Sequence, residues 1–140
     1  MSLKIKFLSV LAGLLASLFM VTATQAAMPE PVDPRVIVDM SFDQRLAHLK
    51  QVNDSILKST HQEIRAYWEK FGQKISALSP ADQKYIYEKR QANAKALTQE
   101  QKNAITAQRK AYFSAMTPEQ KKAVKAYIDG SKQYQANSKQ

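Results

Sequence analysis

The side chains that could carry acid–base, nucleophilic or metal chemistry are few in this sequence. It contains no cysteine, and its only histidines are His48 and His61. Neither histidine has an acidic residue three or four positions away, so a helix would not place a base beside a carboxylate. The sequence therefore predicts a protein that is not an enzyme and that uses no cofactor.

Metal binding within one chain is not indicated either. His48 and His61 stand 13 positions apart, which on one continuous helix is a rotation of about 220° and places them on nearly opposite faces. The residues one turn from His61 are Leu57, Lys58, Ile64 and Arg65, which are not ligands. We expect no metal site in the chain, while a site assembled between two subunits stays open.

The first residues have the pattern of a cleavable signal peptide. Lys4 and Lys6 precede an apolar run of 15 residues, from Phe7 to Val21, that is broken only by two serines. A helix needs roughly 20 apolar residues to span a bilayer, so this run is too short for a membrane anchor. Small residues follow, and cleavage after Ala26 fits best. We expect residues 1–26 to be removed, leaving an exported protein with no stable membrane insertion; a periplasmic location is what the family resemblance described below implies.

A 19-residue repeat is the most informative feature of the remaining chain. Its five units place Ser or Thr three positions before Gln, Glu or Asp, which is the spacing of a helix capping box. In such a box the hydroxyl accepts from the N3 amide, and the N3 side chain accepts from the amide of the cap. The predicted pairs are Ser41 with Gln44, Thr60 with Glu63, Ser79 with Asp82, Thr98 with Gln101, and Thr117 with Gln120.

Two of these caps are firm helix starts. Pro80 and Pro118 follow Ser79 and Thr117 directly, and proline at the first helical position prevents a helix from continuing through it. We expect helices over about 42–77, 80–115 and 118–134. Thr60 and Thr98 lie inside the first two, where each could mark a cap, a bend or a continuous helix.

The overall prediction is an all-α fold. Gly72 and Gly130 are the only glycines after residue 26, so the turns that a sheet requires are scarce. We expect a flexible segment at 27–39, a single helical domain at 40–135 and a disordered tail at 136–140. Because the middle of the chain is poor in branched aliphatic residues, we also expect a homodimer.

A mixed cationic and aromatic surface is the candidate binding site. Removing residues 1–26 takes away two lysines and no acidic residue, so the net charge falls from +9 to +7. In the 19-residue repeat, Arg90 and Arg109 occupy a position that is apolar in other units, where it is held by Val52, Phe71 and Ile128. Such a surface attracts acidic, partly unfolded chains and holds them by apolar contact. The candidate client-binding residues are Tyr85, Tyr87, Arg90, Arg109, Tyr112 and Phe113.

The repeat resembles a known family. Leu97-Thr-Gln-Glu-Gln101 matches the LTxxQ motif of the Spy/CpxP group of periplasmic helical proteins, and Met116-Thr-Pro-Glu-Gln120 is a near match. The unit that begins at Leu78 departs from the motif, since Asp82 stands where the motif has glutamine. The resemblance implies long antiparallel helices in a thin, curved hairpin or bundle that is dimeric. It also implies a protein that either shields unfolded proteins without ATP or damps an envelope-stress sensor.

Two functions are therefore open. The first is a holdase whose partners are unfolded or partly folded envelope proteins, with induction by stress left open. The second is a regulatory or structural adaptor that docks one envelope partner such as a sensor domain, or a metal-responsive member of the same family. We expect no nucleic-acid partner, because the basic residues form no cluster of the kind that reads a groove.

Overall fold

The computed structural model describes residues 28–137, and the side chains of residues 28–129. This part of the chain is all-α and contains six helices, with no strand. The helices are α1 (Pro34–Asp39), α2 (Phe42–Ile56), α3 (His61–Ser76), α4 (Pro80–Lys95), α5 (Gln99–Ala115) and α6 (Pro118–Asn137). The prediction of an all-helical fold is confirmed.

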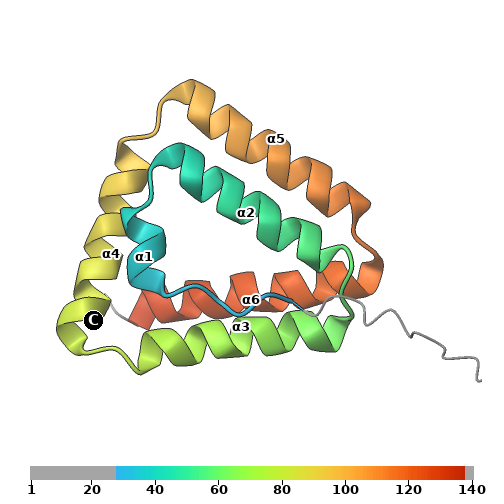
Figure 1. The fold of residues 1–140 in the computed structure, drawn as a ribbon, viewed down its shortest axis with the longest axis horizontal. Coiled ribbons are helices and arrows are strands. Elements are labelled where there is room, and N and C mark those ends of the chain that lie inside the picture. The colour runs from blue at the N-terminus through green and yellow to red at the C-terminus, as the bar shows by residue number, and fades with distance from the viewer. Residues whose placement is uncertain (1–27, 138–140) are drawn as a thin grey trace, which may run out of the picture.

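The helices follow the sides of a triangle that the chain traces twice (Figure 1). The first circuit runs through α1, α2 and α3, and the second through α4, α5 and α6. Each helix of the second circuit packs against its counterpart in the first, so that α1 pairs with α4, α2 with α5 and α3 with α6. Three 19-residue units, which begin at the caps of α4, α5 and α6, make the second circuit, while the first circuit contains two units and the short α1.

Capping residues form the corners of the triangle. Ser41, Thr60 and Thr98 each accept a hydrogen bond from the N3 amide of the helix that follows, and the N3 side chain accepts in return from the cap amide. Thr117 and Gln120 exchange the same two bonds, at 3.0 and 3.2 Å. Ser79 accepts from the amide of Asp82 at 3.1 Å. These bonds satisfy orphan amides where each helix begins.

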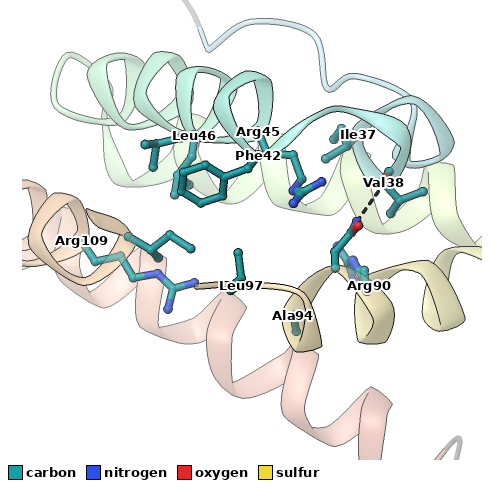
Figure 2. A pocket seen from close by; sticks show the side chains of 12 residues that line it. Ile37, Val38, Phe42, Arg45, Leu46, Arg90, Ala94, Leu97 and Arg109 are labelled. Carbon is teal, nitrogen blue, oxygen red and sulfur yellow. Dashed lines mark hydrogen bonds between the residues drawn. The ribbon is translucent and has the colours of Figure 1, made fainter. Parts of the chain in front are cut away.

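The α1–α4 side is joined by polar side chains. Asn93 donates to the carbonyl of Val38 at 2.9 Å (Figure 2), which satisfies a carbonyl in the last turn of α1. The hydroxyl of Tyr85 donates to Asp39 at 2.6 Å. Arg35 contacts Asp82 at 3.3 Å, but this pair is exposed and contributes little to stability.

The other two sides differ in how closely their helices pack. Along α3 and α6 the contact is extensive, with the Trp68 and Tyr127 rings stacked at a centroid distance of 3.8 Å. The α2–α5 side is looser: α5 has no buried side chain, and its Tyr112 hydroxyl donates to the carboxylate of Asp54. The space between α2 and α5 is therefore only partly filled.

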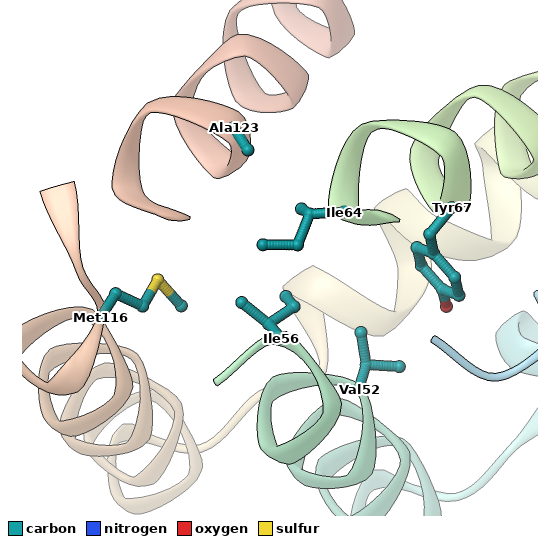
Figure 3. Close-up of a cluster of buried hydrophobic side chains, with 6 residues drawn as sticks. All are labelled: Val52, Ile56, Ile64, Tyr67, Met116 and Ala123. Carbon is teal, nitrogen blue, oxygen red and sulfur yellow. The ribbon is translucent and has the colours of Figure 1, made fainter. Parts of the chain in front are cut away.

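The hydrophobic core lies at the corner where the α2–α3 and α5–α6 connections meet. Ile56 and Ile64, on either side of the first connection, are 2% and 0% exposed. Figure 3 shows these two side chains pointing toward each other, with Met116 and Ala123 from the second circuit beside them. Burying this apolar surface is the main force that holds the two circuits together.

The structure corrects the predicted helix lengths and arrangement. Helices end at Ile56 and Lys95, so the helices predicted over 42–77 and 80–115 are each two helices, with caps at Thr60 and Thr98. Residues 28–137 instead form six shorter helices along a triangle, and the expected thin, curved hairpin or bundle of long antiparallel helices is not confirmed for them. Four or five turns of helix between corners close a triangle, because each cap redirects the chain after roughly 24 Å of helix.

The N-terminal segment is also more ordered than the prediction of a flexible stretch at 27–39. Asp33 caps α1, and Pro34 occupies its first turn. Glu30 contacts Lys70 and Lys74 of α3 at 3.3 and 3.6 Å, so the chain before α1 lies along α3. At the other end α6 extends to Asn137, past the expected end near residue 134.

The expected signal peptide at 1–26 and the last residues of the expected tail, 138–140, lie outside the described residues. Among the helices that the structure does describe, none is long and apolar enough to cross a bilayer.

Candidate functional site

The predicted client-binding residues do not gather at one site in the structure. Tyr87 lines a groove between α3, α4 and α6, and Arg109 lines a second groove between the α1–α2 and α4–α5 segments. Arg90 lines both. The hydroxyls of Tyr85 and Tyr112 are engaged with Asp39 and Asp54, as described above. Phe113 is exposed at the end of α5, under the ammonium of Lys121 at 5.0 Å from the ring centroid.

The first groove, here called the aromatic groove, has a volume of about 410 Å³. Its wall on α3 contains Trp68, Phe71 and Ile75, and its wall on α4 contains Ile86 and Tyr87. Ala123, Ala126 and Tyr127 of α6 complete it. Small alanine side chains on α6 leave room above large rings on α3, which is why the helices can pack closely and still enclose a groove.

The Trp68 indole is fixed by rings on three sides. It stacks on Tyr127 with an interplanar angle of 13°, and Tyr67 and Phe71 meet it edge-on at 4.8 and 6.0 Å. Both arrangements are favourable for aromatic quadrupoles. The indole N–H is buried and has no hydrogen-bond partner among the described residues, so ring packing holds Trp68 in place.

Gly72 opens the groove on its α3 side. It lies in the middle of α3, and a Cβ added to it would meet no heavy atom within 4 Å. Glycine in a helix interior costs roughly 1 kcal/mol relative to alanine. The space beside Gly72 is therefore kept open at the expense of helix stability.

Two arginines stand at the aromatic groove. Arg65 pairs with Glu69 across one helical turn, at 3.9 Å. Burial raises the pKa of Tyr127, and the positive charge of Arg90 acts on that pKa in the opposite direction. Arg90 lines the groove from the α4 side together with Tyr127, and it is exposed and has no carboxylate partner among residues 28–129. It supplies positive charge directly beside an apolar surface.

The second groove, here called the arginine groove, has a volume of about 230 Å³. Figure 2 shows Phe42 and Arg45 reaching from α2 into the gap and Arg109 extending from α5 toward Leu97. Leu46, Leu49, Leu97 and Ile105 are half-buried apolar residues that line it. No acidic residue is part of its lining.

In the part of the chain that the structure describes, His48 and His61 do not form a metal-binding group. His48 lies half-buried on α2 and His61 is the first residue of α3. Burial lowers the pKa of His48. Residues 28–137 contain no group of three His, Asp or Glu side chains placed to hold a metal ion.

Sequence reasoning missed several residues that form these grooves. Trp68 could not be singled out, because its spacing does not distinguish a core ring from a groove wall. Arg45 was not singled out, since a single basic residue on a polar helix is ordinary. Gly72 did carry a signal: an isolated glycine among bulky residues of a helix often marks a packing or functional requirement.

Comparisons of the chain with family models, with curated proteins and with solved structures find no match.

Proposed function

We propose that this protein is a periplasmic, ATP-independent holdase of the Spy/CpxP type that captures unfolded or aggregation-prone envelope proteins in the aromatic groove. The observation that carries the proposal is the position of Arg90. Its side chain lines an open groove of aromatic and aliphatic residues and has no acidic partner among the described residues. A client segment with apolar side chains beside a carboxylate matches both features.

The groove suits short apolar segments and not a folded surface. Its apolar walls gain free energy by removing exposed side chains of a client from water, at about 25 cal/mol per Å² of apolar surface. Arg90 adds attraction for acidic clients at a distance, and the net charge of +7 that remains after removal of residues 1–26 extends that attraction over the whole mature chain. Neither contribution depends on nucleotide hydrolysis.

Self-association belongs to the same proposal. α5 contributes no buried side chain, and Phe113 and Ile128 are 49% and 44% exposed. A homodimer that covers the outer surface of α5 would bury apolar area that the monomer leaves in water. Sedimentation of the mature protein at micromolar concentration tests this, and a compact monomer at all concentrations would contradict it.

One observation favours the adaptor function as the second candidate. Promiscuous binding surfaces generally use flexible, adaptable side chains, whereas Trp68 is held by three rings. A rigid wall of this kind fits a single partner shape, such as a sensor domain, better than many.

An aggregation assay with two unrelated denatured substrates separates the two candidates. A holdase suppresses light scattering of both substrates at near-stoichiometric ratios, without ATP. An adaptor leaves both aggregation curves unchanged, and that result would overturn the holdase proposal.

A further inference from the structure

The arginines of the described chain fall into two groups. Arg35 and Arg65 contact carboxylates, at 2.7 and 3.9 Å for their shortest pairs. Arg45, Arg90 and Arg109 contact none among the described residues, and all three line the arginine groove. Three guanidinium groups around one apolar space form a concentration of uncompensated positive charge, which a ligand with an anionic group can neutralise.

The three guanidinium groups differ in how free they are. Arg45 donates to the carbonyl of Met40, and Arg90 also lines the aromatic groove together with Tyr127. Arg109 is exposed, and no hydrogen bond or ion pair is found for it within residues 28–129. Its planar group can bind a carboxylate through two parallel hydrogen bonds.

The remaining lining offers few hydrogen-bond acceptors for the amides of a polypeptide backbone. An extended peptide brings amide and carbonyl groups that need partners once they are buried. The only uncharged polar side chain in the lining is Asn93, and its amide already donates to the carbonyl of Val38 at 2.9 Å. A hydrocarbon chain needs no such partners and fits between Phe42, Leu46, Leu97 and Ile105.

We propose that the arginine groove binds a single-chain amphiphile with a carboxylate headgroup, such as a medium- to long-chain fatty acid. The alkyl chain lies between α2 and α5, and the carboxylate pairs with Arg109 at the mouth of the groove, within the field of Arg45 and Arg90. This site does not depend on client capture by the aromatic groove.

Fluorescence titration of the full mature chain with dansyl-labelled undecanoate, below its micelle concentration, tests the proposal. We expect saturable binding that decanoate displaces and that decanol and decyltrimethylammonium displace at least about tenfold more weakly, since they lack the anionic group. Equal displacement by all three compounds, or no saturable binding, would overturn it.

Variants locate the site. Arg109→Gln should weaken binding about tenfold, whereas Lys110→Gln, which removes the same charge from the neighbouring exposed position of α5, should leave it unchanged. Ala94→Leu places a larger side chain in the groove lining and should abolish binding by filling the space that the alkyl chain needs. Helical circular dichroism is recorded for each variant, and equal binding by Arg109→Gln and the parent chain would contradict the assignment.

Discussion

The side-chain nitrogen of Gln120 lies 3.0 Å from the carbonyl oxygen of Ile56, and this contact joins the start of α6 to the end of α2. The same nitrogen lies 3.2 and 3.0 Å from the carbonyls of Leu57 and Ser59, while the side-chain oxygen accepts from the amide of Thr117. The buried side chain of Gln120 thus caps α6 and also donates to carbonyls at the α2–α3 connection, which belongs to the first circuit.

Replacing Gln120 by Ala should therefore lower the free energy of unfolding by more than the loss of an ordinary helix cap does. The change removes the donor to the carbonyls of Leu57 and Ser59, while the carbonyl of Ile56 keeps the amide of Ser59 at 3.1 Å. Losing this donor costs about 1–3 kcal/mol in addition to the cap itself. Gln101→Ala is the matched control, because Gln101 holds the same box position in α5 and exchanges its cap hydrogen bonds with Thr98 alone. Urea unfolding measures both, and equal losses of unfolding free energy would show that the inter-circuit bonds contribute nothing.

Alkaline stability should depend on Tyr67. This ring is 4% exposed, and burial raises the pKa of its phenol to about 12 from an ordinary 10.0. The folded state therefore favours the neutral phenol, and this stabilisation is complete below pH 10 and is lost as the pH rises toward 12. By about pH 11 the loss is on the order of 1 kcal/mol.

The comparison of Tyr67→Phe with the parent chain tests that expectation. Phenylalanine keeps the ring and removes the titrating group, so the variant's unfolding free energy should fall less between about pH 9 and pH 11.5. Identical slopes for the two proteins over this range would rule out Tyr67 as the source.

Client capture should depend on salt through Arg90. Arg90→Gln should weaken binding of an acidic unfolded substrate severalfold at low ionic strength, and the difference should shrink at about 0.5 M salt, where charges are screened beyond a few ångströms. Lys95→Gln removes the same charge from an exposed position of α4 that lines neither groove. If both variants lose capture equally, net charge and not Arg90 is responsible.

The parts of the fold that local chemistry determines were the ones that sequence could predict. A capping box needs only residues three positions apart, and the structure has caps at all five predicted positions. Asp33 followed by Pro34 is the same kind of signal, and it could have revealed α1, which was missed because six residues carry almost no apolar periodicity.

The stacking of one circuit on the other was not predictable in this way. It depends on the direction in which the chain leaves each corner, and on contacts such as Gln120 with Ile56 that span 64 positions. For the same reason, the 19-residue repeat could set Arg90 and Arg109 apart from the apolar residues at the same position of other units. It could not show that Arg45 and Trp68 would share grooves with Arg90.

The most direct test of the proposed function is capture by Gly72→Leu. The new side chain enters open space in the aromatic groove, while replacing glycine in a helix interior should stabilise α3 by roughly 1 kcal/mol. Ala66→Leu, at an exposed position of α3 outside the groove, is the control. We predict that Gly72→Leu melts at a higher temperature and suppresses substrate aggregation several times less well than Ala66→Leu; unchanged suppression by a stably folded Gly72→Leu would contradict capture in this groove.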